Sequence, residues 1–402
     1  MFDLTQFIKD KVVMRQESMF RPDIEAHARE LADAISGKSV LVIGGAGSIG
    51  SSFVKAILPF KPRTLVVVDI NENALAEQTR DLRSTKGMYI PDEFISYPMD
   101  YASPSFKHMM DKRKGFDVVA NFSAHKHVRS EKDIYSIEAL LRNNVINAKK
   151  LLDILKTYPP KAYFCVSTDK AANPVNIMGA SKRIMEDLIF CYSEYFPVKT
   201  ARFANVAFSN GSLPAGFVER LGKHQPLSAP LDVKRYFVSP EESGQICMLS
   251  CFLGNNREIF FPKLKEAQMM TFDAIAENFL KAHGYEPLYC NSDDEAKDKM
   301  QTMSVTDKSY PVHFAKSDTS GEKMFEEFFT DDESVDQERF SSLGVVIGKA
   351  LPSKDKLETL ISSLDEAFED PDLEKERIVT LLEDYLGNFE HIETGKSLDS
   401  KM

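Results

Sequence analysis

A glycine-rich turn between an apolar run and a helix-like segment constrains the fold of this chain more than any other feature. The apolar run at residues 40–43 leads into Gly-x-x-Gly-x-x-Gly. Between a strand and a helix, such glycines permit a tight turn and let the backbone approach a pyrophosphate. The N-terminus of the following helix then offers unpaired N–H groups to the phosphates. The pattern predicts a dinucleotide site formed by Gly44, Gly47, Ser48, Ile49 and Gly50.

Strand-like and helix-like segments alternate through the first half of the chain. Residues 64–68, 116–120 and 162–166 read as buried strands. Apolar residues between 137 and 155 recur at helical spacing, and a shorter helix is expected over 51–58. This alternation predicts an α/β protein with a parallel, doubly wound Rossmann sheet.

The length of 402 residues allows one large core and a smaller domain. We expect a helical N-terminal extension over 1–36 and a cofactor-binding Rossmann domain over 37–205. A smaller C-terminal substrate-binding domain with interleaved Rossmann elements is expected over 206–330, and an acidic helical extension over 331–402. Its clearest helix spans 373–386.

Three segments of the second half are expected to lack regular structure. Glycine and proline predict loops at 211–216 and 225–230. Residues 291–308 are polar and short of apolar side chains, which predicts a mobile insertion.

The overall charge limits the classes of partner. A net charge of −11 argues against nucleic acid or an anionic membrane as the main partner. The first 30 residues lack the apolar core of a signal peptide, and nothing approaches the ~18 apolar residues of a membrane span, so a cytoplasmic protein is expected. The five cysteines are scattered and odd in number, which predicts reduced thiols and no zinc site.

Two acidic residues follow predicted strands near the glycine turn. Asp69 lies 19 residues after Gly50, at the end of the second strand. An acid there hydrogen-bonds the adenosine ribose and repels a 2′-phosphate, which predicts NAD as the cofactor, although a helix cap is the alternative. Asp100 ends the expected third strand and is a candidate contact to the adenine.

The strand over 162–166 leads directly into Ser-Thr-Asp-Lys at residues 167–170. Adjacent Asp169 and Lys170 can supply an acid and a base, and a hydroxyl from Thr168 or Ser167 can bind a developing oxyanion. Alone, such a pair also fits a solvated ion pair at the end of a strand. Its position after a cofactor turn favours the catalytic interpretation.

The segment 167–183 resembles the active-site segment of the polysaccharide-biosynthesis nucleotide-sugar 4,6-dehydratases, a family of extended short-chain dehydrogenases/reductases. It reads Ser-Thr-Asp-Lys-Ala-Ala-Asn-Pro-Val-Asn-Ile-Met-Gly-Ala-Ser-Lys-Arg. The resemblance covers most of residues 37–330, with further matching stretches at 124–128, 202–206, 235–237, 258–263 and 321–323. The superfamily normally carries Tyr-x-x-x-Lys where this chain has Met178-x-x-x-Lys182. The Met variant resembles the subgroup that acts on UDP-N-acetylglucosamine.

The resemblance implies a reaction and roles for these residues. Oxidation at carbon 4 acidifies the carbon-5 proton, a base removes that proton, water leaves from carbon 6, and the hydride returns there. By resemblance, Asp169 is the acid and Lys170 the base, although the two roles can be exchanged. Lys182 holds the nicotinamide ribose. Because Met178 cannot exchange a proton, Asp169, a water or a Lys170 relay are all candidates for deprotonating the carbon-4 hydroxyl.

Further residues are expected to support the site. Lys126 is a candidate contact to the substrate or to Asp169, and Met178 is expected to shape the pocket. Asn205 and Arg235 are candidates for the diphosphate, since the planar fork of arginine suits phosphate. The family also implies that Asn144 supports the active-site lysine and that residues 321–323 close the nucleotide pocket. His125 and His127 lack a third ligand at a telling spacing, so no metal is expected.

Two other functions fit parts of the pattern. A nucleotide-sugar 4-epimerase would need the tyrosine that Met178 replaces, whereas a 5-epimerase acting on the same keto intermediate fits better. A decayed NAD-binding scaffold is favoured by Met178 and opposed by the intact Asp169, Lys170 and Lys182. Pairing of the superfamily through Rossmann helices implies a homo-oligomer. UDP and GDP sugars both fit these residues, as do both configurations at carbon 5.

Overall fold

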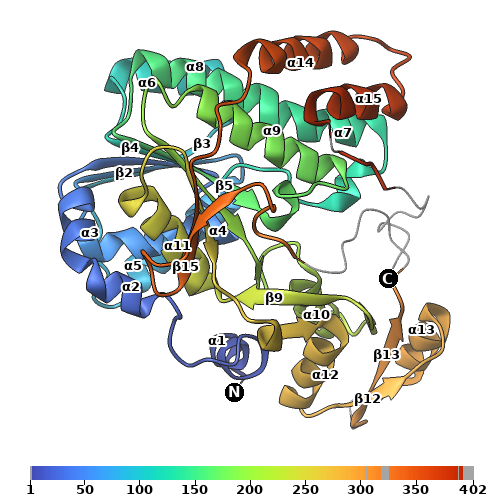
Figure 1. Ribbon diagram of the computed structural model, residues 1–402. Helices are drawn as coiled ribbons and strands as arrows, with labels where there is room; N and C mark the ends of the chain where they lie inside the picture. Colours follow the sequence, from blue (N-terminus) through green and yellow to red (C-terminus); the bar gives the residue numbers. More distant parts are fainter. Residues whose placement is uncertain (1, 305, 318–325, 388, 393–402) are drawn as a thin grey trace.

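A large twisted sheet forms the centre of the molecule (Figure 1). The structure is a computed structural model, and it describes residues 2–304, 306–317, 326–387 and 389–392. Within these residues, nine strands lie in the order β14-β15-β10-β6-β5-β4-β1-β2-β3. They are β1 (Ser39–Ile43), β2 (Thr64–Asp69), β3 (Glu93–Pro98), β4 (Val118–Asn121), β5 (Ala162–Thr168), β6 (Val198–Phe203), β10 (Glu258–Pro262), β14 (Ser334–Asp336) and β15 (Leu343–Ile347). The strands from β10 to β3 are parallel. The order β3-β2-β1-β4-β5-β6 within them confirms the predicted doubly wound Rossmann sheet.

Helices cover both faces of this sheet, which explains why its central strands are apolar throughout (Figure 1). One face carries α4 (Ser48–Ile57), α5 (Glu72–Ser84) and α11 (Pro240–Leu253). The other carries α6 (Pro104–Arg113), α7 (Ile134–Leu141), α8 (Ala148–Thr157) and α9 (Ile177–Cys191). Val66 and Val67 of β2 and Val119 of β4 are fully buried between these layers.

The helix expected between residues 137 and 155 is interrupted. A π-helical turn, Arg142–Asn147, separates α7 from α8. Such turns widen a helix locally and are frequent at functional sites. Asn144, which the sequence marks as a support for the active-site lysine, lies in this turn and is buried.

The N-terminal segment is helical, as predicted, and contacts two cores. Its helices are α1 (Leu4–Phe7), α2 (Arg21–Ala26) and α3 (Ala28–Ile35), with a π-helical turn at Ile8–Val12. Leu31 and Ile35 of α3 pack into the main core. Phe7 packs into the smaller core instead, with its ring centroid 6.0 Å from that of Phe279.

The smaller core is built from the second half of the chain. Its elements are β7 (Asn205–Val206), α10 (Leu213–Gly222), β8 (Leu227–Pro230), β9 (Lys234–Val238), β11 (Met269–Thr271), α12 (Phe272–Ala282), β12 (Glu286–Tyr289), α13 (Asp293–Thr302) and β13 (Ser309–Ala315). The strands form two three-stranded sheets, β11-β9-β7 and β12-β13-β8. These elements lie within the stretch expected to bind substrate, and the domain boundaries themselves stay a prediction.

Three local predictions in this region were wrong. Residues expected to form loops lie partly in α10 and partly in β8. Helix α10 starts there because Ser212 caps it and a proline lies in its first turn. The expected mobile insertion contains α13, whose N-cap Ser292 accepts a hydrogen bond from Glu295 N. Its Ala296 is fully buried, so even a mostly polar helix has a packed face.

The acidic C-terminal extension is not helical throughout, contrary to the prediction. It begins with β14 and β15, which extend the main sheet: β15 pairs antiparallel with β10, and β14 pairs antiparallel with β15. Leu343 and Val345 are fully buried, so this stretch is part of the main core.

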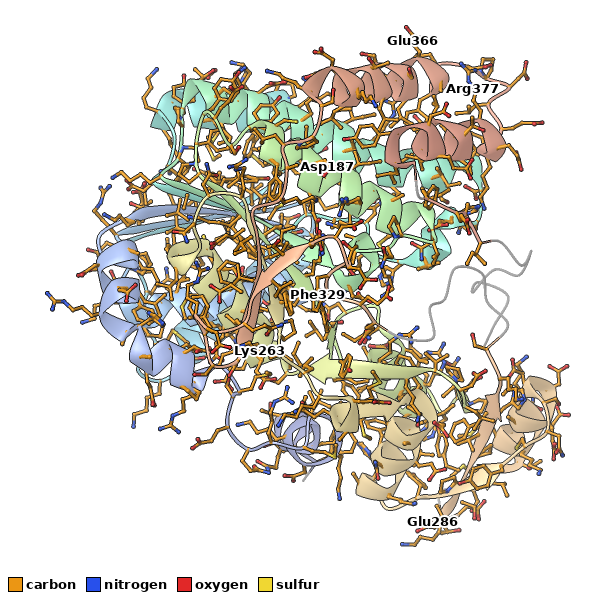
Figure 2. All side chains as sticks on the ribbon, in the orientation of Figure 1. Asp187, Lys263, Glu286, Phe329, Glu366 and Arg377 are labelled. Atoms are coloured by element: carbon orange, nitrogen blue, oxygen red, sulfur yellow. The ribbon has the colours of Figure 1, made fainter. Side chains whose placement is uncertain are left out.

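Helices α14 (Lys354–Ala367) and α15 (Lys375–Leu386) follow and pack beside α9 (Figure 1). The second confirms the helix expected over 373–386. Asp187 of α9, labelled in Figure 2, accepts hydrogen bonds from Lys349 and from Tyr385 of α15. The extension thus rests on one of the Rossmann helices, and the expected homo-oligomer stays a prediction.

The five cysteines all lie in the described residues, and none forms a disulfide, as predicted. Among the helices of the described residues, none has both the length and the apolar character that a bilayer span needs.

Candidate active site

The glycine turn lies where the sequence places it, between β1 and α4, and its shape leaves no room for side chains. Gly44 has φ +68°, and a Cβ there would lie 2.6 Å from Ser123 N. A Cβ on Gly50 would lie 2.4 Å from Gly44 O. Gly47 is the N-cap residue of α4, and Ser48 begins the helix. This backbone cradle at a helix N-terminus fits the pyrophosphate of a dinucleotide.

Asp69 closes the turn from the neighbouring strand. Its carboxylate accepts hydrogen bonds from Ala46 N at 3.0 Å and from Asn71 N at 2.9 Å. Asp69 thus lies at the end of β2 beside the glycine turn. From this position it is predicted to hydrogen-bond the adenosine ribose. Asp100 lies beyond β3, is exposed and accepts a hydrogen bond from Ala102 N. Its contact to adenine stays a prediction.

A cavity of about 1300 Å³ runs from Ile49, at the start of α4, to the smaller core; Gly44, Gly47, Ser48, Gly50, Asp69 and Asp100 are not among its lining residues. Cavities for one drug-sized ligand typically measure roughly 300–1,000 Å³, so this one has room for a dinucleotide and a second ligand. Most of the predicted site residues line it: Ile49, Lys126, Ser167, Thr168, Asp169, Lys170, Met178, Lys182, Asn205 and Arg235.

The catalytic candidates follow the end of β5 in a single 3₁₀ turn, Asp169–Ala171. Lys170 Nζ lies 3.1 Å from Asp169 Oδ2 and 3.2 Å from Oδ1. The Thr168 hydroxyl donates to Asp169 Oδ1 at 2.7 Å. Asp169 is 5% exposed, so the pair is not the solvated surface pair considered as an alternative. The turn presents an acid, an amine and a hydroxyl to the cavity together.

Ser167 is bound differently from its neighbours. Its hydroxyl donates to Glu186 Oε1 at 2.6 Å inside the protein. Glu186 also binds Arg202, whose guanidinium reaches Glu333 at 2.6 Å, and the side chains of Arg202 and Glu186 are fully buried. Burial raises the pKa of Glu186, but Arg202 outweighs it and holds that pKa at about 2. Ser167 therefore anchors the end of β5, and Thr168 is the hydroxyl that remains beside Asp169.

Met178 and Lys182 lie one turn apart on α9, where the superfamily has its Tyr-x-x-x-Lys pair. Both are buried and line the cavity. Lys182 Nζ donates to Val166 O at 3.1 Å, which fixes the amine near the end of β5. Burial lowers the pKa of Lys182 to about 8. Met178 has a thioether where the superfamily's tyrosine has a phenol, and a thioether cannot exchange a proton. A proton transfer at this position therefore needs another group.

Asn144 ties the loop after β4 to α9. Its side chain accepts from His125 N at 2.9 Å and donates to His125 O at 2.9 Å. It also donates to Ser181 Oγ at 3.0 Å, next to Lys182. Asn144 therefore positions the loop that carries Lys126, as well as the helix that carries the active-site lysine. Desolvation lowers the pKa of Lys126 at the cavity wall.

Asn205 and Arg235 lie near the catalytic turn, around a carboxyl group that the sequence reading missed. Glu326 Oε1 accepts from Asn205 Nδ2 at 2.7 Å, and Oε2 accepts from Tyr236 N at 2.8 Å. Burial raises the pKa of Glu326 to about 8, and the charge of Asp169 adds to this effect. Glu326 follows the predicted closing segment 321–323, which lies outside the described residues. Its closeness to that motif is the one sequence signal that could have marked it.

The start of α9 is held by a second carboxylate that the sequence reading missed. Glu131 Oε1 accepts from Met178 N at 3.0 Å, and Glu131 Oε2 lies 3.3 Å from His391 Nε2. Ile392 N donates to Val175 O at 3.1 Å. The C-terminal end of the described chain therefore rests on the turn before Met178. No local pattern joins residues 131 and 391, which are 260 positions apart.

The far end of the cavity is lined by basic and acidic side chains of the smaller core. Arg220 and Lys316 line it, together with His313 and Asp293. His313 Nδ1 lies 2.5 Å from Asp293 Oδ1, and Asp293 begins α13, the helix expected to be a mobile insertion. A protein with net charge −11 thus carries cations in its cavity wall, as a polyanionic ligand requires.

Comparison with known proteins gives consistent matches. The model of a family described as polysaccharide biosynthesis protein matches residues 40–347. An uncharacterized membrane protein of Methanocaldococcus jannaschii is 30% identical over 89% of this chain and 98% of its own length. The probable polysaccharide biosynthesis protein EpsC of Bacillus subtilis is 27% identical over 84% of this chain, which spans 52% of that relative. A UDP-N-acetylglucosamine 4,6-dehydratase (inverting) of Campylobacter jejuni is 25% identical over 60% of this chain and 72% of its own length.

Solved structures share the fold. Pen from Bacillus thuringiensis matches with a TM-score of 0.63 and 19% identity over 82% of this chain and 98% of its own. DesIV from Streptomyces venezuelae, a dTDP-glucose 4,6-dehydratase with NAD and TYD bound, matches with a TM-score of 0.55 and 17% identity over 84% of this chain and 99% of its own. These likenesses agree with the Rossmann architecture read from the sequence.

Proposed function

Because the chain belongs to the polysaccharide biosynthesis protein family, we propose that it is an NAD-dependent nucleotide-sugar 4,6-dehydratase. One observation carries this proposal above the others. The Asp169–Lys170 pair lines the same cavity as Met178 and Lys182, next to a turn shaped for a dinucleotide. A catalytic acid and base are therefore available beside the position of the nicotinamide, although the usual tyrosine is absent.

The residues of the glycine turn fit a bound cofactor. Gly44 and Gly50 keep the turn before α4 tight, so that its backbone N–H groups could hold a pyrophosphate at the start of the helix, and Asp69 beside it favours NAD over a 2′-phosphorylated cofactor. NAD, when bound, supplies the acceptor and later the donor of the sugar hydride. Lys182, held on Val166 O, places a positive charge where the nicotinamide ribose would lie.

The remaining chemistry consists of proton movements by the side chains of this chain. Asp169 serves as the acid that protonates the leaving carbon-6 oxygen, and Lys170 as the base that takes the carbon-5 proton. The Thr168 hydroxyl is available to the carbon-4 oxygen and to Asp169. The buried position of Asp169 makes such charge interactions stronger than they are in water.

We propose UDP-N-acetylglucosamine as the substrate and the UDP-4-keto-6-deoxy-N-acetylhexosamine as the product, for surface glycan synthesis. The Campylobacter relative, named for this substrate, supports the assignment. Arg220 and Lys316 at the far end of the cavity suit the diphosphate. Asn205 and Arg235, which the sequence suggests for the diphosphate, also line the cavity and remain candidates for it.

Incubation with UDP-N-acetylglucosamine and NAD in deuterated water tests the proposal. Dehydration predicts a product that has lost water and carries a carbon-6 methyl group and one deuterium at carbon 5. Mass spectrometry and proton NMR report both changes. Asp169→Asn is the matched control and should yield at least about 100-fold less product in the same time.

Two other outcomes would contradict the proposal. An isomer that keeps the carbon-6 hydroxyl identifies an epimerase. Unchanged substrate, together with tight NAD binding, identifies a scaffold that has lost its activity.

A further inference from the structure

The first turn of α9 lies directly against the catalytic turn. Gly179 packs so closely there that a Cβ on it would lie 2.6 Å from Lys170 O. Met178 precedes Gly179, and Lys182 follows about one turn later on the same helix. Because a packed interior transmits displacements rather than absorbing them, a shift of this helix start would move the catalytic pair relative to Met178 and Lys182.

Glu131 holds the start of α9 from another part of the chain. It ends the 3₁₀ turn Val128–Glu131, and its side chain is 9% exposed. Glu131 Oε1 accepts from Met178 N at 3.0 Å, while the N-cap Asn176 accepts from Gly179 N at 2.7 Å. N–H groups in the first turn of a helix lack partners within the helix, and a carboxylate there is also favoured by the helix dipole. Glu131 therefore completes the cap of the helix that carries the active-site lysine.

The C-terminal extension holds Glu131 from the other side. Glu131 Oε2 lies 3.3 Å from His391 Nε2, and Lys375 Nζ of α15 donates to Glu131 O at 3.3 Å. Ile392 N donates to Val175 O at 3.1 Å, directly before the helix. The extension thus contacts both the residue that completes the cap and the segment that joins the catalytic turn to α9.

We propose that Glu131 is a positioning residue of the enzyme, which sets α9 against the catalytic turn through its hydrogen bond with Met178 N. This role rests on the proposed dehydratase function and deepens it, because it connects the C-terminal extension to the reaction. Lys182, expected at the nicotinamide ribose, moves with α9, whereas Asp169 and Lys170 belong to the turn beside it. A misplacement of about 1 Å between reacting groups can lower a rate by about 10²-fold.

Three substitutions separate the reach of the Glu131 side chain from its charge. Glu131→Ala removes the acceptor for Met178 N, and Glu131→Asp keeps the charge on a side chain that is one methylene group too short. Glu131→Gln keeps an oxygen that can accept from the same N–H. Asp133→Ala is the matched control, since Asp133 is a nearby carboxylate that caps α7 instead, by accepting from Ser136 N at 2.7 Å.

The readout is kcat per NAD-binding site, with the number of sites taken from calorimetric titration of each variant with NAD. Glu131→Ala and Glu131→Asp should lower this kcat by about 10–100-fold for UDP-N-acetylglucosamine. KM and NAD affinity should change little, because the glycine turn and the far end of the cavity are untouched. Glu131→Gln should keep most of the wild-type kcat, and Asp133→Ala should match wild type.

A merely structural role gives a different result. It would lower the number of NAD-binding sites but leave kcat per site unchanged, and that outcome overturns the proposal. An equal loss in Asp133→Ala, or a Glu131→Gln as slow as Glu131→Ala, also overturns it. If Glu131→Ala does not fold, the more conservative Glu131→Asp decides, and a full kcat per site in that variant rejects the role.

Amide hydrogen exchange of the NAD-bound protein separates this role from the proposed function. Residues 172–182 should exchange faster in Glu131→Ala than in wild type and in Asp133→Ala, because Met178 N has lost its acceptor. Faster exchange in a protein that does not dehydrate the sugar keeps the contact and rejects the dehydratase. Unchanged exchange together with normal dehydration keeps the dehydratase and rejects Glu131 as a positioning residue.

Discussion

The glycine turn and the catalytic turn end two strands of one parallel sheet, yet they are held in place in different ways. Gly44 and Gly50 are constrained by nearby backbone atoms, which leave no space for a Cβ. The residues around Asp169 are held instead by side chains from other elements: Met178 N donates to Glu131, and the Ser167 hydroxyl donates to Glu186. The glycine turn is therefore shaped by close backbone packing that only glycine permits, whereas the catalytic turn is held by side-chain hydrogen bonds.

The largest effect should come from the catalytic pair itself. Asp169→Asn and Lys170→Ala should each lower kcat by about 10²–10⁴-fold, the usual contribution of a positioned acid or base. NAD affinity, measured by calorimetry, should change little because the glycine turn is untouched. Near-normal turnover in either variant would remove that residue from the mechanism.

The buried ion network behind Ser167 should dominate stability. Arg202→Met leaves Glu186 and Glu333 without their guanidinium, and removal of one buried partner typically destabilises by about 3–5 kcal/mol. The loss is measured by urea unfolding. Arg21→Met is the control, since Arg21 makes only exposed pairs with Glu17 and Glu25. Equal stability of the two variants would contradict a structural role for the network.

The same network predicts an acid dependence. The lowered pKa of Glu186 contributes stability that is present above the unfolded value near 4.5 and is lost as pH falls towards about 2. The unfolding free energy of wild type should therefore fall over this interval. The fall should be smaller in Arg202→Met, and identical slopes would reject this interpretation.

A substitution in the glycine turn should lower NAD affinity, which the catalytic variants leave almost unchanged. Gly50→Ala sets a Cβ against Gly44 O, and forcing an extra methyl group into a packed position typically costs about 1–3 kcal/mol. NAD affinity should fall, while the contacts of Asp169 stay intact. Gly222→Ala is the control, because a Cβ there meets nothing within 4 Å. Unchanged NAD affinity in Gly50→Ala would contradict the assigned cradle.

The smallest effect should come from the C-terminal contact to the catalytic helix. His391→Ala removes the partner of Glu131 but leaves the bond from Met178 N to that carboxylate. The loss of one such hydrogen bond is worth about 1 kcal/mol. A fall in kcat of up to about fivefold is expected, with KM and NAD affinity unchanged. A change confined to NAD affinity would argue against a role at Met178.

The parts of the fold that the sequence predicted are those with local causes. The apolar run of β2, the glycine turn and the helix at Lys375–Leu386 follow from patterns of a few residues. The strands β14 and β15 were missed because an acidic composition outweighed a short apolar stretch that pairs with β10. The helix α13 was missed because its single apolar face is short.

The residues of the active site also fall into two groups, those that a sequence motif predicts and those that only the fold brings together. Asp169, Lys170, Met178 and Lys182 stand in one motif, and the structure brings them to one cavity. Glu326 could be suspected only from its closeness to residues 321–323, and no sequence pattern connects His391 with Glu131. The catalytic role of Ser167 stays a prediction, because the residue lines the cavity while its hydroxyl donates to Glu186.

The central claim is that Asp169 and Lys170 act on a sugar held against the nicotinamide. A crystal structure of the Asp169→Asn enzyme with NAD and UDP-N-acetylglucosamine tests it most directly. We predict that residue 169 and Lys170 lie within hydrogen-bond reach, about 2.6–3.2 Å or one water, of the substituents on carbons 4 to 6. A sugar bound elsewhere in the cavity, with Lys170 facing solvent, would contradict the account.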